Sequence, residues 1–419
     1  MNFQVSTIGE FVKTRNSSSL NQSQILFDRT LLSVVVILIA IGMIMVTSSS
    51  MYYAQNTFNG HSFHFINRHI IYLIISFVLG ALVLTQPVIR WQKYGPYLLV
   101  VGILLLILVY FAGKSVNGSR RWLSIGPLTF QVSEVVKLFV IVYLAGYLVR
   151  RTDEIQNQFT GFLKPLIVLA LISVLLILEP DFGATVVILS TSMAMLFLGG
   201  AKLWQFIGLA ATVGVTLIAL VIYSPYRLKR VLTFMDPWAV QFGDGYQLTQ
   251  SLIAFGRGNI FGQGLGNSLQ KLSYLPEAHT DFIFAVLAEE QGLIGVLIVM
   301  LLFFILFYRS MKIGRKALMQ QRAFSAYLAY GIGFWLTFQA LINIGVTSGA
   351  LPTKGLTLPF VSYGGNSLLI CSIAIGLLLR IDYENKLVTN KQLNAEESEI
   401  KYISDSSEKK SVKEKKSKR

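Results

Sequence analysis

The chain has 419 residues, of which 53% are hydrophobic and only 14% are charged. This composition excludes a soluble globular domain and is typical of a polytopic membrane protein. The net charge is +15, but 11 of the 36 Lys and Arg residues lie from position 380 onward, in a tail with few aromatic residues, so we expect no nucleic-acid partner. The single cysteine, Cys371, excludes an intramolecular disulfide and a thiolate metal cluster.

Ten apolar runs are near or above the ~18 residues that a helix needs to cross a bilayer. They centre on residues 31–51, 70–87, 96–113, 131–149, 163–179, 183–200, 203–223, 282–308, 325–347 and 366–380. No alternating strand pattern and no internal repeat competes with these runs. The sequence therefore predicts an all-α polytopic membrane protein with ten transmembrane helices. Only EPDFG separates the fifth and sixth runs, so a count that fuses or drops one helix stays open.

The Lys and Arg residues of the short loops favour an orientation with both termini in the cytoplasm. This orientation predicts a cytoplasmic N-terminal segment over residues 1–30 and a transmembrane domain over residues 31–384. Residues 224–281, between helices 7 and 8, form a large extracytoplasmic loop. Residues 385–419 are predicted to be a basic, disordered cytoplasmic tail that is attracted to anionic membrane lipids.

Ionisable residues gather at the predicted outer face. Ionisable side chains near or within spans are costly and usually face a cavity or a partner, so this grouping predicts a polar cleft that opens outward. For Glu134 and Lys137, which are spaced i,i+3, a structural ion pair is the alternative. The residues are Arg121 in NGSRRW, Glu134 and Lys137 in the fourth span, Glu179 and Asp181 in EPDFG, and Lys354 in LPTKGLT.

Asp281 directly precedes the eighth span, in LPEAHTDF. A carboxylate in this place commonly caps the helix N-terminus. Beside a substrate hydroxyl, the same carboxylate is a candidate general base, and both alternatives stay open. Glu277 and His279 are candidate substrate contacts, although His279 also fits an ordinary loop histidine with local hydrogen bonds. Outside the cytoplasm an enzyme has no ATP, and basic residues beside a base suit a pre-activated donor with a diphosphate leaving group.

Five motifs resemble the SEDS family of peptidoglycan glycosyltransferases. They are NGSRRWLSIGPLTFQVSE, EPDFGA, GYQLTQSLIAFGRGNIFGQGLGNS, KLSYLPEAHTDFIFAVLAEEQG and LPTKGLTLPFVSYGGNSLL, and the resemblance extends from about residue 30 to residue 384. NGSRRW, LPEAHTDF and LPTKGLTLP are more similar to the cell-division members, FtsW, than to the elongation members, RodA. Two positions depart from the family pattern: Val132 stands where a proline is usual, and Asn366 where a serine is usual.

The resemblance implies that the chain polymerises lipid II into glycan strands. The 4-hydroxyl of an acceptor GlcNAc attacks C1 of the donor MurNAc with inversion, and undecaprenyl diphosphate leaves. Asp281 matches the family's essential Asp, cast as the general base, and Arg121, Glu134 and Lys137 match other functionally important positions. From their charge and predicted side, we expect Arg121, Lys137 and Lys354 to contact the diphosphate.

The resemblance also implies partners and a place in the cell. The partners are a growing glycan chain, a class B penicillin-binding protein (an FtsI-like transpeptidase) and other divisome proteins, at the septum in the bacterial inner membrane. A lipid II flippase and a non-catalytic division scaffold are the alternative functions. We assign no cofactor, since no cluster of metal ligands is visible in the sequence, and leave open a divalent cation, Mg²⁺ or Mn²⁺, on the diphosphate.

Overall fold

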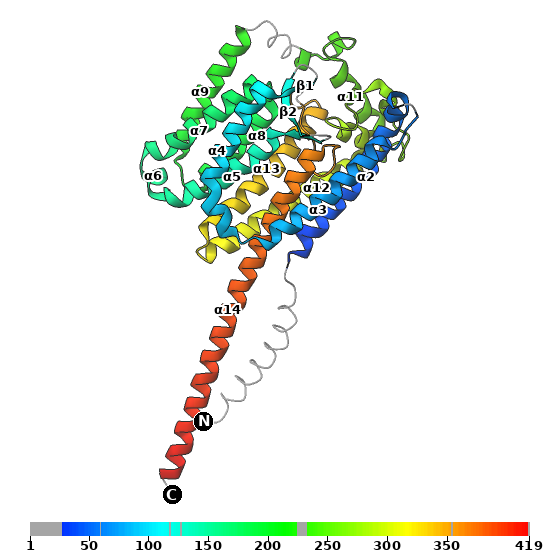
Figure 1. Cartoon of the computed structure of the whole chain (residues 1–419). Coiled ribbons are helices and arrows are strands. Elements are labelled where there is room, and N and C mark those ends of the chain that lie inside the picture. Colours follow the sequence, from blue (N-terminus) through cyan, green and yellow to red (C-terminus); the bar gives the residue numbers. More distant parts are fainter. Residues whose placement is uncertain are drawn as a thin grey trace.

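The computed structural model describes residues 27–58, 60–116, 119–125, 128–223, 233–352 and 355–417. Helices dominate this part of the chain and pack into one bundle (Figure 1). They are α2 (Arg29–Thr57), α3 (His64–Thr85), α4 (Val88–Ala112), α5 (Val132–Arg150), α6 (Thr152–Asn157), α7 (Phe159–Leu178), α8 (Phe182–Leu198), α9 (Leu203–Ile222), α11 (Tyr246–Gly258), α12 (Ile283–Met319), α13 (Ala323–Thr347) and α14 (Gly365–Ser417). Two short helical turns, η1 (Trp238–Val240) and η2 (Gln270–Tyr274), lie in the predicted large loop.

Each of the ten predicted apolar runs coincides with one long helix. Within the described residues, eight helices are long and apolar enough to cross a membrane. The other two runs fall on α8, which has 17 residues, and on α9, which has 20. EPDFG separates α7 from α8, so the alternative of one fused helix is wrong. The chain is a multi-pass, all-α membrane protein, while passage of all ten helices through the bilayer stays a prediction.

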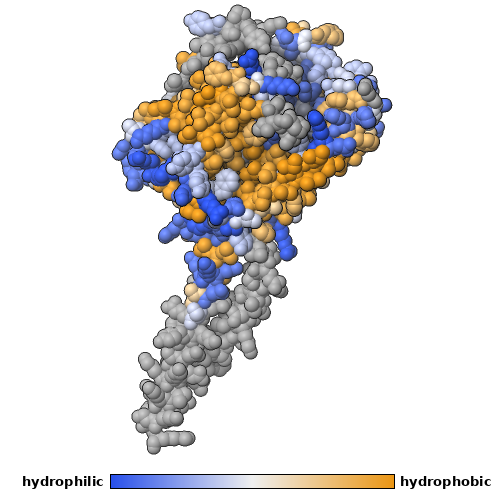
Figure 2. Space-filling view, in the orientation of Figure 1, coloured by the Kyte–Doolittle hydropathy of each residue, from blue (hydrophilic) through white to orange (hydrophobic). Residues whose placement is uncertain are grey.

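The surface of the bundle is suited to lipid rather than to water. Figure 2 shows broad hydrophobic areas on the helices, with hydrophilic residues gathered toward the ends of the bundle. Large apolar side chains such as Phe77 and Phe111 are 76% and 75% exposed. Because contiguous apolar surface of this extent is stable only when it is covered, the lipid bilayer is its natural solvent.

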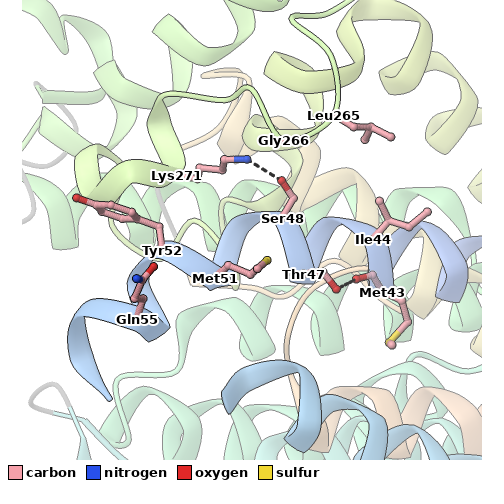
Figure 3. Close-up of a pocket in the computed structure, with 10 residues that line it drawn as sticks. All are labelled: Met43, Ile44, Thr47, Ser48, Met51, Tyr52, Gln55, Leu265, Gly266 and Lys271. Carbon is pink, nitrogen blue, oxygen red and sulfur yellow. Dashed lines mark hydrogen bonds between the residues drawn. The ribbon is translucent and has the colours of Figure 1, made fainter. Parts of the chain in front are cut away.

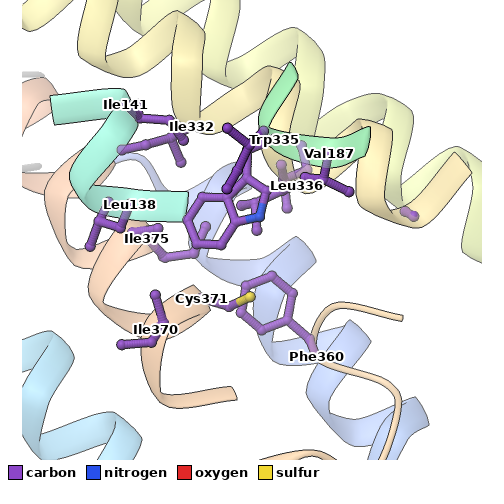
Figure 4. Packing of buried hydrophobic residues seen from close by; sticks show 14 of the residues in the cluster. Leu138, Ile141, Val187, Ile332, Trp335, Leu336, Phe360, Ile370, Cys371 and Ile375 are labelled. Carbon is purple, nitrogen blue, oxygen red and sulfur yellow. The ribbon is translucent and has the colours of Figure 1, made fainter. Parts of the chain in front are cut away.

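A central helix and its neighbours form the core beneath the polar end of the bundle. In an apolar stretch of 18 residues in α5, 83% of the residues are buried inside the protein, against 11% in the corresponding stretch of α3 at the periphery. Trp335 of α13 is fully buried and packs with Leu138 of α5, Val187 of α8 and Cys371 of α14 (Figure 4). Four helices that are distant in sequence therefore meet around one indole ring, and their positions are fixed together.

The two ends of the bundle differ. In Figure 1, α2 begins and α14 leaves the bundle at one end, whereas α11 and the small β-sheet lie at the opposite end. The sheet has three antiparallel strands in the order β1 (Lys114–Val116), β2 (Ser119–Ile125) and β3 (Leu128–Gln131). No strands were predicted, because the apolar runs of the sequence indicate the spans and carry little information on the short strands between α4 and α5.

The C-terminal segment differs from its prediction. Residues 385–419 were predicted to be disordered, but α14 continues without a break to Ser417. This segment has too few apolar residues to form a packed core, but a helix can form without one. Lys and Glu are good helix formers, and they dominate the segment. The cytoplasmic location of the tail stays a prediction.

Candidate active site

Asp281 lies in a turn over residues 276–282, which places it just before α12. The N-cap residue of α12 is Phe282, and no side chain caps this helix. The capping alternative for Asp281 is therefore wrong. Among the described residues, no hydrogen bond reaches the Asp281 carboxylate, whereas its backbone carbonyl accepts one from Asn343 of α13. The carboxylate is thus left available for a substrate group.

The surroundings of Asp281 change its acidity. Burial, helped by the negative charges of Glu277 and Asp181 and opposed by Arg121, raises the pKa of its carboxyl to about 7. An isolated charge is poorly solvated in such a place, which favours the protonated form. A general base works best when its pKa lies near the operating pH, so this environment suits a carboxyl that accepts a proton from a hydroxyl.

The segment that follows residues 353 and 354 covers Asp281. A Cβ atom added at Gly355 would lie 2.7 Å from Oδ2 of Asp281, which is closer than real Cβ contacts. A larger residue at this position would require the Asp281 carboxylate to move. Gly355, from the motif LPTKGLT that was predicted at the outer face, therefore lies directly at the candidate base. Lys354 itself lies outside the described residues, so its predicted contact with a diphosphate stays a prediction.

Replacing Gly355 by Ala is expected to displace the Asp281 carboxylate and lower the rate of glycan polymerisation about 10²-fold, since a shift of ~1 Å in a reacting group costs this much. The measurement is the initial rate with labelled lipid II. Gly256→Ala is the matched control, because a Cβ atom at Gly256 in α11 meets nothing within 4 Å. Equal rates for both variants would contradict a tight cover over Asp281.

Two amides on α13 connect the site. Nδ2 of Asn343 donates to the backbone carbonyls of Asp281 at 2.8 Å and of Leu356 at 2.5 Å. One turn earlier, Nε2 of Gln339 donates to the carbonyl of Thr357 at 3.0 Å. Neither residue was predicted from the sequence to belong to the site. The signal was present, because Gln and Asn four residues apart in an apolar span commonly hydrogen-bond across helices.

Glu134 and Lys137 form an ion pair in the protein interior. Nζ of Lys137 lies 2.8 Å from Oε1 of Glu134, and only 1% and 5% of the two side chains are exposed. Lys137 also donates to Oε1 of Gln339 at 2.6 Å and lies over the ring of Trp335. The structural alternative of a mutual ion pair is confirmed. Direct contact of Lys137 with a diphosphate stays a prediction, and Gln339 links the pair to the cover over Asp281.

Arg121 reaches the turn between α7 and α8 from strand β2. Its Nε donates to the carbonyl of Glu179 at 3.2 Å, and its Nη2 donates to the carbonyl of Pro180. Asp181 begins α8 by accepting from the backbone N–H of Ala184, and it accepts a second hydrogen bond from the hydroxyl of Ser133 at 2.8 Å. Strand β2, α5 and the EPDFG turn are thereby joined, and the charge of Arg121 is brought close enough to act on Asp281.

Glu179 is the second carboxyl of this turn, and it is 1% exposed. Neither of its carboxylate oxygens has a hydrogen-bond partner among the described residues. Burial, helped by the charge of Asp181 and opposed by Arg121, raises the pKa of Glu179 to about 8. Two of the acidic residues predicted for the outer face, at positions 179 and 281, therefore have carboxyls whose surroundings favour protonation, while the predicted polar cleft stays a prediction.

The remaining predicted contacts flank the base. The ring of His279 packs against Tyr53, Phe65 and Tyr363, with centroid distances of 5.5, 4.6 and 5.8 Å. Burial lowers the pKa of His279, which favours the neutral ring. Glu277 is exposed, and its carboxylate accepts from the hydroxyl of Thr280. Substrate contacts of both residues stay predictions.

A separate groove lies between α2 and the segment around residue 271 (Figure 3). It encloses about 710 Å³ and is lined by Met43, Ile44, Thr47, Ser48, Met51, Tyr52, Gln55, Leu265, Gly266 and Lys271. Its charged group is already paired, because Nζ of Lys271 lies 2.9 Å from Oε1 of Glu290 and 2.9 Å from Oγ of Ser48. None of the predicted site residues lines it, so the chemistry is assigned to the cluster around Asp281.

Within the described part of the chain, no three His, Cys, Asp or Glu side chains are placed to hold a metal ion, and a role for Mg²⁺ or Mn²⁺ stays a prediction.

Curated relatives cover most of the chain. The chain is 52% identical over 369 residues to the probable peptidoglycan glycosyltransferase FtsW of Idiomarina loihiensis, covering 88% of this chain and 90% of that protein. It is 56% identical over 351 residues to the protein of the same name from Coxiella burnetii, with 83% and 94% covered. With the FtsW protein of Escherichia coli O6:H1 the identity is 52% over 365 residues, with 87% and 88% covered.

Solved structures have the same fold. A chain from the structure of a peptidoglycan synthase complex that coordinates polymerization and crosslinking superposes with a TM-score of 0.72 at 26% identity, covering 86% of this chain and 98% of that one. The rod shape determining protein RodA of Thermus thermophilus superposes with a TM-score of 0.63 at 26% identity, with 86% and 97% covered. The sequence model of the FtsW/RodA/SpoVE family, described as a cell cycle protein, matches residues 28–387. The chain therefore belongs to the FtsW/RodA/SpoVE family.

Proposed function

We propose that this protein is a peptidoglycan glycosyltransferase that polymerises lipid II, with Asp281 as the general base. The observation that carries the proposal is the half-buried Asp281 carboxyl, which has Gly355 against it, has no hydrogen-bond partner among the described residues, and has its pKa raised to about 7, chiefly by burial. The names of the FtsW relatives, which are about half identical over most of the chain, support the same reaction.

In the proposed reaction the Asp281 carboxylate accepts the proton of the acceptor GlcNAc 4-hydroxyl. The hydroxyl oxygen forms a bond to C1 of the donor MurNAc while the bond from C1 to the diphosphate oxygen breaks, so C1 is inverted. Undecaprenyl diphosphate leaves with the electron pair of the broken bond. The guanidinium of Arg121 stabilises the negative charge that develops there, because a fixed cation in a poorly hydrated site acts strongly on developing charge.

The proposed partner is a class B penicillin-binding protein that crosslinks the new strands. Its support is the fold shared with a chain of a complex that coordinates polymerization and crosslinking. We further propose that the protein acts at the septum in the inner membrane, with both termini in the cytoplasm. The positive residues of its short loops support this orientation.

The test is polymerisation of labelled lipid II by the purified chain with its penicillin-binding partner, measured across pH. We expect glycan strands to form, with a rate that rises with pH through a midpoint near 7, because Asp281 accepts a proton only after its own carboxyl has lost one. Transport of lipid II across a vesicle membrane without strand formation would favour the flippase alternative. Restored division by a variant that lacks polymerase activity would favour the scaffold.

A further inference from the structure

Two amide side chains on one face of α13 are buried beneath the candidate active site. Gln339 is 0% exposed and Asn343 is 1% exposed. Their spacing of four residues places them one above the other along the helix. In hydrocarbon surroundings an amide is costly unless its hydrogen bonds are made, so two of them at this depth need a reason beyond packing.

Each amide holds a different set of groups, and the sets meet at Asp281. Asn343 donates both of its hydrogen bonds to backbone carbonyls, those of Asp281 and Leu356. Gln339 donates to the carbonyl of Thr357 and accepts from Lys137 and from Nε1 of Trp335. One face of α13 therefore forms hydrogen bonds with three features of the site. These are the turn that carries Asp281, the segment 355–357 and the ion pair of Glu134 and Lys137.

We propose that Gln339 and Asn343 are positioning residues that hold the segment 355–357 against the half-buried Asp281 as a partial cover and limit the access of water to the base. The inference rests on the proposed function, because it gives the cover a role in the action of Asp281. Neither amide touches the reacting atoms. Both act through the backbone carbonyls that they hold.

The packing below the amides supports such a role. Trp335, one turn before Gln339, sits in the core among side chains of α5, α8 and α14, so α13 forms a rigid base for the amides (Figure 4). Above them, the missing side chain of Gly355 lets the backbone approach within van der Waals distance of the Asp281 carboxylate. The amides lie between the packed helix α13 and the segment 355–357. Their hydrogen bonds to the carbonyls of Asp281, Leu356 and Thr357 therefore set how close this segment lies to Asp281.

Removing the hydrogen bonds of Gln339 and Asn343 should change the pKa of Asp281, which a purely structural role of these amides would not do. The charged groups that face Asp281 are Glu277 in its own turn, Arg121 from β2 and Asp181 at the start of α8. None of these is held by the two amides. A loosened cover admits water and favours the charged form of Asp281, so its pKa falls from about 7 toward the ordinary value. The acid limb of the pH–rate profile then moves to lower pH.

The experiment compares Asn343→Ala and Gln339→Ala with the unaltered chain, each as the full-length protein purified with its penicillin-binding partner. The readout is kcat/KM for labelled lipid II between pH 4.5 and 9. We expect the acid limb of both variants to move by about one pH unit or more to lower pH, together with a fall in kcat of about tenfold. Asn343→Ser, a smaller change that keeps one donor, is expected to shift the limb less and provides a second variant if the alanine variant folds poorly.

Asn385→Ala is the matched control. Asn385 is 0% exposed and its amide likewise donates to a backbone carbonyl, that of Ile313 in α12, but it lies in α14 beyond the described site. We expect this variant to lose thermal stability without moving the acid limb. If Asn343→Ala and Gln339→Ala also lost stability without moving the limb, the cover proposal would be overturned. Full polymerase activity in Asp281→Asn would instead overturn the proposed function.

Discussion

Replacing Asp281 by Asn is expected to lower the rate of glycan polymerisation by ~10²–10⁴-fold, the usual contribution of a general base. The amide has nearly the shape of the carboxylate but cannot accept the hydroxyl proton. The fold is expected to survive, because no hydrogen bond to the Asp281 carboxylate is found among the described residues and its backbone contact with Asn343 is kept. The measurement is the initial rate of strand formation from labelled lipid II, beside the thermal midpoint of the purified protein.

Asp236→Asn is the control for this prediction, because it makes the same change in the same segment between α9 and α12. Asp236 is exposed, and its carboxylate accepts from the backbone N–H of Ala239, which an Asn side chain also permits. Its polymerase rate should stay close to that of the unaltered protein. A rate for Asp281→Asn that matched this control would remove Asp281 from the mechanism.

Replacing Lys137 by Met is expected to lower the free energy of unfolding by roughly 3–5 kcal/mol, the usual cost of breaking a buried ion pair. The substitution leaves Glu134, which is 4% exposed, without its cation. It also removes the donor to Gln339, so the link between the ion pair and the cover over Asp281 is lost. The measurement is the midpoint of thermal unfolding in detergent, together with the polymerase rate.

Two comparisons separate the charge from the packing. Lys164→Met breaks an ion pair with Glu154 in which the lysine side chain is 51% exposed, and it should change the unfolding midpoint little. The double variant Glu134→Gln/Lys137→Met leaves no unpaired charge, so it should recover much of the lost stability. A double variant as unstable as Lys137→Met would contradict the electrostatic explanation.

The helices were largely predictable because the bilayer imposes a simple requirement on the sequence. A span must be apolar over most of its length, and all ten apolar runs coincide with helices. Several helices extend beyond the predicted runs: α4 begins at residue 88 rather than 96, α3 begins at 64 rather than 70, α2 ends at 57 rather than 51, and α12 and α14 continue further still. The three-stranded sheet was missed because it is short and lies outside the spans. The helical tail was missed because composition predicts whether a core forms and does not predict the local conformation.

The site was predictable in its residue types and only partly in its geometry. The position of Asp281 before α12 left a capping role and a catalytic role open, and the two are compatible. The placement of Phe282 as the N-cap residue removes the capping role, while the catalytic role stays a proposal. Gln339 and Asn343 interrupt an apolar span, which indicates hydrogen bonds to neighbouring elements but does not identify the partners. Their importance follows from the carbonyls that they meet, one of which is 62 residues away in the chain.

The sequence alone determined the class of protein, the approximate limits of the spans and the presence of acids and bases at one end, because hydropathy and charge are properties of each residue by itself. Only the tertiary structure decided that the Asp281 carboxyl is half-buried, that Gly355 lies against it and that two amides of α13 donate to the carbonyls of Asp281, Leu356 and Thr357. These features depend on which groups meet after folding. The pKa of a carboxyl is set by the water and the charges that folding leaves around it, and the order of residues along the chain does not contain that information directly.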